Sequence, residues 1–355
     1  MKILHFSESI KGGVATYLNL LDDGLSRCQF QNHYLVPHSH KSELDITENK
    51  LSFHDGGRGV SSLIAMFFKL SKTVSDIKPD VIYAHSTFAG LLLIIYKLFY
   101  GAKIVYCPHG WAVFREQSKI KKKIISFIEK YMSVVPDVIV DISRFEHECT
   151  KTLGYKGNKV CIPNSVKLSD EVKLHKADEV ERCIELLFVG RFDHQKGLDI
   201  ILDALEIVNR NRIKFKITLV GGSVLNSETK FNFEHPWITN VGWVSNKDID
   251  AFYQKADLLV IPSRWEGFGL VVLEAYRNST PVLSSTSGAL PFLVDENLTG
   301  YVSEPNAQAF VERLETINLN DLNRMRMFCR TKAELQFNVN DFTSKHVNVI
   351  NSLIS

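Results

Sequence analysis

The sequence lacks most of the features that mark a metal-binding, secreted or membrane-spanning protein. It has six cysteines and no C-x-x-C pair, a pattern that argues against a zinc site and for free thiols in a reducing compartment. Its longest apolar run, residues 88–96, is far shorter than the ~20 residues that cross a bilayer. The first residues already read as a strand, so we expect no signal peptide ahead of the fold and a cytoplasmic location.

An excess of charge of one sign is also missing. The 355 residues carry a formal net charge of +2, which gives no argument for binding nucleic acid. With 45% hydrophobic and 23% charged residues, the composition is that of an ordinary globular protein. The length suits two domains of roughly 150 residues each.

Short apolar strands alternate with helical patterns along the chain, which predicts α/β domains with parallel sheets covered on both faces. The first set of strands is expected near residues 2–6, 33–36, 81–84, 103–107, 138–140 and 159–162, and the second near 186–189, 216–220, 240–243, 258–261 and 281–284. We therefore expect one domain over residues 1–165, a polar linker over 166–183 and a second domain over 184–337. A last helix, within residues 338–355, places Val347, Ile350, Leu353 and Ile354 on one face.

Two glutamates, Glu266 and Glu274, stand eight positions apart where a buried strand gives way to a loop and a helix. The loop and the helix start contain Gly267, Phe268, Gly269 and Leu270. A helix start exposes unpaired backbone N–H groups and the positive end of its dipole, and glycine lets an anion approach them. The stretch therefore suits a phosphate, and carboxylates beside it suit the vicinal hydroxyls of a sugar. By itself the spacing also fits a surface loop followed by a helix face.

A second turn carries two cations. Arg191 and Lys196 lie between a strand near residues 186–189 and a helix that Gly197 opens. An open α/β sheet binds ligands at the carboxyl ends of its strands, and a guanidinium and an ammonium there would neutralise a diphosphate. The alternative is a pair of solvated loop cations.

Two weaker signals lie in the first half of the chain. Gly12 and Gly13 precede a helix and make another loop that a phosphate can approach. The pair is not a dinucleotide fingerprint, because G-x-G-x-x-G is absent. His109 follows the strand near residues 103–107 in the string PHG, where a histidine either binds a ligand or serves as a structural hydrogen-bonding group.

Three of these elements together resemble the pattern of retaining glycosyltransferases of family 4. Glu266 and Glu274 match its E-x7-E element, residues 190–197 its GR-x4-KG spacing, and residues 109–110 its strand-then-HG element. The resemblance covers nearly the whole chain and is specific mainly over residues 186–302. It implies the GT-B fold, in which two Rossmann-like domains face each other across a cleft that closes on the substrate. The first domain would then lie on the acceptor side, the second would bind the nucleotide sugar, and the last helix would pack back on the first domain.

The resemblance also implies a reaction and a role for each site residue. The reaction moves a sugar from a nucleoside-diphosphate sugar, which is a substrate, and it needs no cofactor. The implied contacts are donor-sugar hydroxyls for Glu266, ribose for Glu274, diphosphate for Arg191 and Lys196, sugar for His109, and phosphates or sugar for the backbone of Gly12, Gly13 and residues 267–270. We expect retention of configuration, a UDP-sugar ahead of a GDP-sugar, and a saccharide or polyprenyl-diphosphate-linked acceptor in cell-surface polysaccharide synthesis.

Asp248 and Asp250 form a D-x-D string, which in another class of glycosyltransferase holds a divalent metal. Here the string follows Ser245, where acidic residues satisfy the cap and the dipole of a helix. Because Arg191 and Lys196 already supply positive charge for a diphosphate, we expect no metal ion in the reaction.

One further stretch matches no catalytic element. Residues 118–132 place Lys119, Lys121, Lys122, Lys123 and Lys130 among isoleucines and aromatic side chains. Such a basic amphipathic helix can lie on an anionic bilayer, each lysine adding about 1 kcal/mol near the surface. That would make the enzyme peripheral on the inner face of the plasma membrane. The alternative is a domain helix with one buried and one solvated face.

Two other functions fit the same two-domain scaffold. A nucleotide-sugar epimerase would need acid and base groups around the sugar, and only His109 offers one. A non-catalytic subunit that binds a nucleotide sugar would need no more than the residues named above. The donor sugar, its base and the acceptor depend on pocket shape, which sequence motifs do not set.

Overall fold

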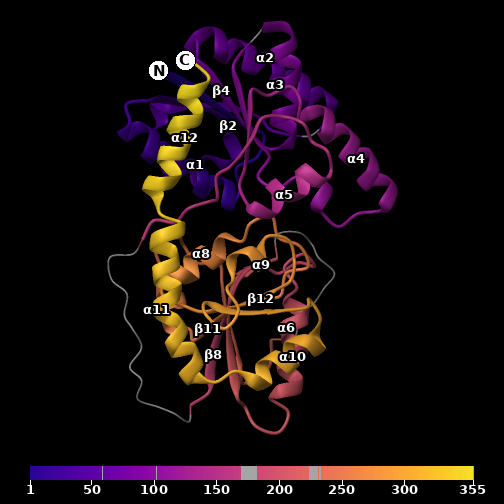
Figure 1. Ribbon diagram of the computed structural model, residues 1–355, viewed down its shortest axis with the longest axis vertical. Helices are drawn as coiled ribbons and strands as arrows, with labels where there is room; N and C mark the ends of the chain where they lie inside the picture. The colour runs from indigo at the N-terminus through magenta and orange to yellow at the C-terminus, as the bar shows by residue number, and fades with distance from the viewer. Residues whose placement is uncertain (58, 101, 169–181, 224–230, 232, 355) are drawn as a thin grey trace. The chain divides into compact units, whose positions relative to one another are not determined.

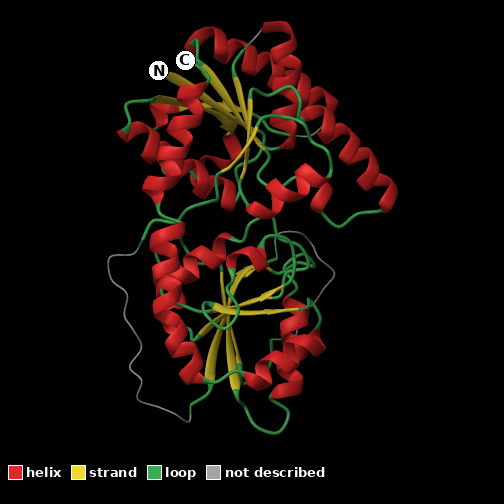
Figure 2. Cartoon of the chain, in the orientation of Figure 1, coloured by secondary structure: helices red, strands yellow, loops and turns green. Residues whose placement is uncertain are grey.

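The computed structural model describes residues 1–57, 59–100, 102–168, 182–223, 231 and 233–354, and the chain divides into two compact units. Unit 1 consists of Met1–Ser165 together with Val339–Ser355, and unit 2 of Val166–Asn338. Figure 1 shows the chain coloured along its length, and Figure 2 shows strands at the centre of each unit with helices around them. Of the linker predicted over residues 166–183, residues 169–181 lie outside the described residues.

Unit 1 is built on a sheet of seven strands in the order β3-β2-β1-β4-β5-β6-β7, paired in parallel throughout. The strands are β1 (Lys2–Ser7), β2 (Gln31–Pro37), β3 (Leu51–His54), β4 (Val81–His85), β5 (Ile104–Cys107), β6 (Val138–Asp141) and β7 (Lys159–Cys161). The helices are α1 (Gly13–Arg27), α2 (Val60–Ile77), α3 (Thr87–Tyr100), α4 (Lys119–Met132), α5 (Arg144–Thr152) and α12 (Val339–Ser352), with short 3-10 turns η1 (His38–Glu43), η2 (Glu48–Lys50) and η3 (Ala112–Phe114).

Alternate side chains of this sheet face two different layers. Leu4 and Phe6 of β1 belong to one buried cluster with Leu70 of α2 and Leu93 of α3. Because successive side chains of a strand point to opposite faces, the residue between them, His5, faces away from that cluster. The second face therefore receives polar rings from the strands, and these rings reappear in the site described below.

The C-terminal helix α12 belongs to unit 1 and packs against α1. Gly24 of α1 allows this approach, since a Cβ there would lie 2.2 Å from Oγ1 of Thr343. The buried residues of α12 are Phe342, Thr343, His346 and Ile350, whereas Ile354 is 45% exposed. Of the predicted face, Ile350 is buried, Val347 and Leu353 are half-buried, and only Ile354 is exposed, so the prediction is wrong at Ile354. The sequence-based prediction missed the buried His346, whose Nε2 forms a 2.7 Å hydrogen bond with the hydroxyl of Tyr17.

Unit 2 is built on a sheet of six strands in the order β10-β9-β8-β11-β12-β13, also paired in parallel. The strands are β8 (Ile184–Arg191), β9 (Phe215–Gly222), β10 (Ile238–Gly242), β11 (Leu258–Ile261), β12 (Val282–Ser285) and β13 (Gly300–Ser303). The helices are α6 (Leu198–Val208), α7 (Ile249–Lys255), α8 (Leu270–Arg277), α9 (Leu290–Leu293), α10 (Ala307–Thr316) and α11 (Leu319–Gln336). Two parallel sheets with helices between successive strands confirm the predicted two-domain α/β fold.

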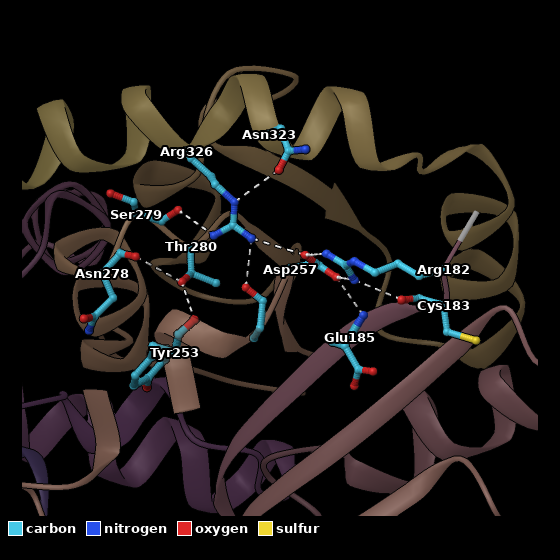
Figure 3. Close-up of polar contacts among 11 residues, drawn as sticks. Arg182, Cys183, Glu185, Tyr253, Asp257, Asn278, Ser279, Thr280, Asn323 and Arg326 are labelled. Carbon is cyan, nitrogen blue, oxygen red and sulfur yellow. Dashed lines mark hydrogen bonds and ion pairs between the residues drawn. The ribbon is translucent and has the colours of Figure 1, made fainter. Parts of the chain in front are cut away.

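Unit 2 also contains a buried ion network around Asp257, the residue that precedes β11 (Figure 3). Its carboxylate accepts hydrogen bonds from both Nη atoms of Arg182, at 2.6 and 2.7 Å, and from the backbone N–H of Glu185 at 2.9 Å. Arg326 of α11 donates to the same carboxylate at 3.3 Å and to the carbonyl oxygen of Ser279 at 3.4 Å. Burial alone would raise the pKa of Asp257, but these contacts hold it below its ordinary value. The network thus ties α11 to the central strand β11.

Arg326→Ala is expected to lower the free energy of unfolding of unit 2 by about 3 kcal/mol, because it removes one partner of a buried charge. Arg324→Ala is the matched control on the same helix. Its side chain is 78% exposed, so the free energy of unfolding should change little. Chemical denaturation followed by tryptophan fluorescence measures both variants, and equal losses would contradict a structural role for the network.

Candidate active site

Two neighbouring strands of unit 2 bring the predicted basic turn and the predicted acidic loop together. The sheet order places β8 beside β11, and parallel strands end at the same edge of a sheet. Lys196 follows β8 and Glu266 follows β11, and Nζ of Lys196 lies 2.6 Å from Oε2 of Glu266. The two side chains are 18% and 12% exposed. The sequence predicted both residues for the site but not the ion pair that joins them.

Close backbone contacts fix these two loops against each other. Gly197, just before α6, has a φ of +68°, and a Cβ there would lie 2.2 Å from the carbonyl oxygen of Pro262. The N–H of Arg264 donates to the carbonyl oxygen of Gln195 at 2.8 Å. The side-chain amide of Gln195 donates to the carbonyl oxygen of Trp265 at 3.2 Å. The ion pair is therefore carried by two loops that brace one another.

Arg191, at the end of β8, is more open than Lys196. Its side chain is 45% exposed, and Nε lies 2.9 Å from Oδ2 of Asp193. Its Nη2 donates to Oε1 of Gln195 at 2.8 Å. Each cation of the turn is thus held by a nearby carboxylate. An anionic ligand would exchange those contacts for its own, so the turn can bind a diphosphate without leaving a buried charge unpaired.

The loop after β11 runs into the start of α8 at Gly269, whose φ is +98°. Phe268 is only 4% exposed, and its ring centroid lies 6.4 Å from that of Phe337. Its side chain therefore packs in the core, and only its backbone can contact a ligand. Together with Gly267 and Leu270, this segment offers backbone N–H groups at a helix start, as the anion site requires.

Glu274 lies about one turn into α8. Its Oε2 accepts a hydrogen bond from the hydroxyl of Tyr253 on α7 at 2.7 Å. Burial raises the pKa of Glu274, and the Tyr253 hydroxyl and Arg277 oppose that shift. Sequence reasoning missed Tyr253, because the contact joins two helices and follows no motif. The tyrosine fixes the orientation of the carboxyl group.

In unit 1, Gly12 and Gly13 stand at the start of α1 and are exposed. Gly12 has a φ of +62°, and a Cβ there would meet nothing within 4 Å. The first turn of α1 contains no acidic residue, so no side chain of that turn offsets the positive end of the helix dipole. The geometry is that of a loop that a phosphate can approach.

His109, also in unit 1, follows β5 with a φ of +52°, a backbone conformation that is uncommon outside glycine. Its Nε2 lies 3.0 Å from Nδ1 of His85, the last residue of β4. Nε2 of His85 lies 3.0 Å from Nδ1 of His5 in β1. Burial lowers the pKa of His109 and His5 to about 3 and that of His85 well below its ordinary value. All three imidazoles are therefore neutral near neutral pH, and the sequence had singled out only His109.

Both halves of the chain match models of known families. A model described as Glycosyltransferase Family 4 matches residues 11–170, and one described as Glycosyl transferases group 1 matches residues 170–334. The chain is a family 4 glycosyltransferase with the GT-B fold. The predicted family and fold are thereby confirmed.

The chain is also similar to individual proteins over most of its length. The transferase is 33% identical over 365 residues to an uncharacterized 41.2 kDa protein in the cps region of Klebsiella pneumoniae, an alignment that covers 99% of this chain and 100% of that protein. It is 26% identical to the UDP-Gal:alpha-D-GlcNAc-diphosphoundecaprenol alpha-1,3-galactosyltransferase of Escherichia coli, over 79% of this chain and 76% of that one. Anabaena Alr3699/HepE in complex with UDP-glucose matches with a TM-score of 0.80 and 18% identity, over 99% of this chain and 100% of that one, a likeness of fold alone.

Three buried carboxyl groups of the transferase hold the loop that contains His109. Glu146 accepts a hydrogen bond from the backbone N–H of Trp111 at 3.3 Å, and Asp141 accepts one from its indole at 3.1 Å. Glu129 accepts one from the next backbone N–H at 2.7 Å. Burial, together with the nearby charge of Asp141, raises the pKa of Glu146 to about 8. None of the three was predicted, since they lie on different elements and share no motif.

The two acids of the D-x-D string are engaged within the transferase. Asp248 precedes α7, but its side chain makes no capping hydrogen bond and instead accepts one from the hydroxyl of Ser245 at 2.6 Å. The expected capping role is therefore wrong for Asp248. Asp250, in the first turn of α7, lies 2.6 Å from Nη2 of Arg277.

Among the described residues, His85, Cys107 and His109 form a group whose potential ligand atoms all lie within 4.8 Å of one another. The two imidazoles already share a hydrogen bond, and burial raises the pKa of the Cys107 thiol well above its ordinary value. Both ring nitrogens of His85 and Nε2 of His109 are used in hydrogen bonds between imidazoles.

Glu146 should make the stability of the transferase depend on pH. Its folded-state pKa of about 8 lies above the ordinary value of 4.5, so the folded chain keeps a proton that the unfolded chain releases. Stability should therefore fall as pH rises from about 5 to about 8. Glu146→Gln keeps the shape of the neutral acid and should remove that part of the slope.

Denaturant midpoints measured at about pH 5.5, 7 and 8.5 test this prediction. Glu148→Gln, an exposed position on the same helix, should keep the slope of the parent protein. A slope that Glu146→Gln leaves unchanged would mean that the buried carboxyl does not hold the proton.

Proposed function

We propose that the protein is a retaining glycosyltransferase that moves a sugar from a nucleoside-diphosphate sugar to a saccharide or polyprenyl-diphosphate-linked saccharide, in the synthesis of a cell-surface polysaccharide. The observation that carries the proposal is the joined basic turn and acidic loop at the ends of β8 and β11. They offer two cations for a diphosphate, and a carboxylate for sugar hydroxyls lies 2.6 Å from one of them. Such a site suits a substrate that is anionic at one end and rich in hydroxyls at the other.

In the proposed reaction, the diphosphate takes over the contacts that now neutralise the cations. Lys196 exchanges Glu266 for a phosphate oxygen, and Glu266 then accepts hydrogen bonds from the donor sugar. As the bond between sugar and phosphate breaks, the diphosphate gains charge and the sugar becomes cationic. Lys196 and Arg191 therefore bind the transition state more strongly than the ground state. The acceptor hydroxyl enters on the face that the diphosphate leaves, its oxygen bonds to the sugar, and its proton passes to the departing diphosphate. No nucleophilic carboxylate is needed.

The remaining site residues take the roles that the family resemblance implies. The backbone of residues 267–270 and of Gly12 and Gly13 serves the phosphates or the sugar, Glu274 the ribose, and His109 the sugar. The reaction in this proposal uses no metal ion and no cofactor, because side-chain cations neutralise the leaving group.

The names of the relatives support a particular donor and acceptor. The Escherichia coli relative is named for UDP-galactose and a diphosphoundecaprenol-linked sugar, and the Anabaena structure contains UDP-glucose. We therefore place a UDP-sugar ahead of a GDP-sugar as donor. A lipid-linked acceptor would locate the enzyme in the cytoplasm, on the inner face of the plasma membrane.

Incubation with a panel of UDP- and GDP-sugars in excess chelator, followed by mass spectrometry of the products, tests this proposal. We expect a nucleoside diphosphate to be released from a UDP-sugar, by transfer to an acceptor or by slow hydrolysis. An isomerised nucleotide sugar would indicate an epimerase instead, and binding without turnover a non-catalytic subunit. Activity that appears only with manganese or magnesium would contradict the metal-free reaction.

Lys196→Ala and Glu266→Gln are expected to move UDP affinity in different directions. Removing Lys196 deletes a charge-assisted contact with the diphosphate, so UDP binding should weaken and transfer should slow about 10²-fold. Glu266→Gln frees Lys196 from its partner, so UDP should bind at least as tightly as before. Transfer should still fall, because the lost carboxylate faces the sugar. Titration calorimetry with UDP and a transfer assay separate the two effects.

Lys216→Ala, at an exposed position of β9, is the control for the loss of a lysine and should leave both measurements unchanged. Equal losses of UDP affinity in the Lys196 and Glu266 variants would contradict the exchange of partners.

The basic helix α4 carries an apolar stripe that unit 1 does not bury. Ile120, Ile124, Phe127 and Tyr131 recur at helical spacing and are 75%, 56%, 63% and 65% exposed. The buried residues of α4 are instead Glu129 and Met132. The lysines predicted to contact a membrane, Lys119, Lys121, Lys122, Lys123 and Lys130, belong to the same helix. We propose that this helix lies on an anionic bilayer, with its apolar stripe at the boundary between headgroups and acyl chains.

A second exposed apolar stripe, absent from the sequence-based prediction, lies on helix α2. Val60, Ile64 and Phe68 of α2 are 75%, 53% and 68% exposed. Helix α3 contacts both α2 and α4 (Figure 1), so all three helices belong to one layer of unit 1. No described helix is long and apolar enough to cross a bilayer, so the proposed contact is with the membrane surface.

Vesicles that contain anionic lipid should co-sediment with the protein, and less so as salt rises from about 0.05 to 0.3 M, because added salt screens the lysines. Changing Lys121, Lys122 and Lys123 together to Glu should abolish most of the binding, and Phe127→Ser should weaken it. Lys216→Glu, in unit 2, is the control. Binding that ignored both salt and the lysine substitutions would contradict the proposed surface.

A further inference from the structure

The line of histidines in unit 1 can adopt only two arrangements of its protons. His5, His85 and His109 are joined by two ring-to-ring hydrogen bonds of 3.0 Å each. Each bond needs one proton between its two nitrogens, and a neutral imidazole carries one proton. If His85 donates to His109, all three rings carry the proton on Nδ1. If His109 donates to His85, all three carry it on Nε2.

The surroundings of His5, at the other end of the line from His109, distinguish the two arrangements. Nε2 of His5 and Oδ1 of Asn32 are both buried, and neither reaches full hydrogen-bond geometry with another described atom. The amide of Asn32 is oriented by its nitrogen, which donates to Oδ1 of Asp22 at 3.0 Å and to the hydroxyl of Ser26 at 3.4 Å. Its oxygen is therefore the atom left for His5, and an amide oxygen only accepts hydrogen bonds.

The electrostatics of His5 agree with that direction. Burial lowers its pKa to about 3, while Asp22 and hydrogen bonding with Asn32 act to raise it. An acceptor raises the pKa of an imidazole when the ring nitrogen that faces it carries a proton. Nε2 of His5 is thus the protonated nitrogen. A proton there requires that His85 and His109 also carry their protons on Nε2.

We propose that Asn32, His5 and His85 are positioning residues that hold His109 in its Nε2–H tautomer, with Nδ1 left as a hydrogen-bond acceptor. In this state His109 can accept a hydrogen bond from a hydroxyl group but cannot donate one to a phosphate oxygen. The inference rests on the proposed role of His109 toward the donor substrate and deepens it. The part of the substrate that His109 recognises is a sugar hydroxyl.

Aromatic rings enclose the line and supply no competing donor to it. His5 stacks on Tyr34 and Tyr83, with ring centroids 4.7 and 5.5 Å apart. The rings of Tyr17 and His109 pack edge to face, with centroids 4.5 Å apart. The hydroxyl of Tyr17 hydrogen-bonds with the hydroxyl of Tyr83 at 3.0 Å and with Nε2 of a fourth histidine, on α12, at 2.7 Å. Among the described contacts, no tyrosine hydroxyl hydrogen-bonds with a ring nitrogen of the line.

Long-range ¹H–¹⁵N correlation spectra of the full chain labelled with ¹⁵N-histidine report the tautomer of each ring directly. We expect His5, His85 and His109 to give the Nε2–H pattern at neutral pH, with signals assigned from single His→Gln variants. An Nδ1–H pattern at His85 or His109 would overturn the proposal. The readout needs no sugar, so it stands apart from any failure of the proposed transferase activity.

Asn32→Leu removes the acceptor that anchors the line and should mix the Nδ1–H tautomer into His109. Transfer should then slow roughly tenfold, the weight of one hydrogen bond, while UDP affinity is unchanged. Asn32→Asp keeps an acceptor and should keep the Nε2–H pattern. Ser26→Ala removes a neighbour of Asn32 but not the acceptor, and should also keep it.

An Nε2–H pattern at His109 that persists in folded Asn32→Leu would overturn the anchoring role of Asn32. If that variant does not fold, the tautomers of the parent protein and of Asn32→Asp decide the question.

Discussion

The order of strands in the two parallel sheets is the constraint on which the candidate site residues of both units depend. In unit 2, strands β9 and β10 lie on one side of β8, and β11 lies on the other. The loops after β8 and β11 therefore meet, although Lys196 and Glu266 are 70 positions apart in the sequence. In unit 1, the same reversal sets β1 beside β4 and brings His5 to His85. A parallel sheet gathers ligand-binding groups where its winding reverses.

How far the sequence predicts the fold depends on burial. Strands such as β11 are covered on both faces and read as unbroken apolar runs, so the expected residues 258–261 match it. Two of the edge strands, β3 and β13, were not predicted, because four residues are too few for an alternating pattern to stand out from the surrounding loops. Helix α12 was predicted, but its buried His346 was missed, because hydropathy does not register the hydrogen bond that holds this side chain in the core.

The candidate site likewise contains residues that the sequence predicted and residues that it did not. Residues beside glycine-marked turns were predictable, because a turn such as that at Gly197 tolerates no Cβ against the neighbouring loop. Their partners were not predictable. Tyr253, His85 and Glu146 lie on helices or strands with no motif around them, and each reaches its partner across elements. A sequence gives such contacts only once the order of the strands is known.

The polar groups of the two units differ in charge: unit 2 holds an ion pair, whereas unit 1 holds a line of neutral imidazoles. This difference matters for the proposed function. In unit 2, Lys196 and Glu266 neutralise each other until an anionic ligand replaces the carboxylate. Binding to unit 2 would therefore depend chiefly on the charge of the ligand. The histidine line of unit 1 is neutral, so what it distinguishes in a ligand is a hydrogen-bond donor from a hydrogen-bond acceptor. A site that hydrogen-bonds a hydroxyl rejects a substrate without it, because its own polar group is left unpaired. In the proposed function, affinity for the diphosphate would then depend chiefly on Lys196 and Arg191 of unit 2, whereas selection among sugars would depend on Glu266 together with the histidine line of unit 1.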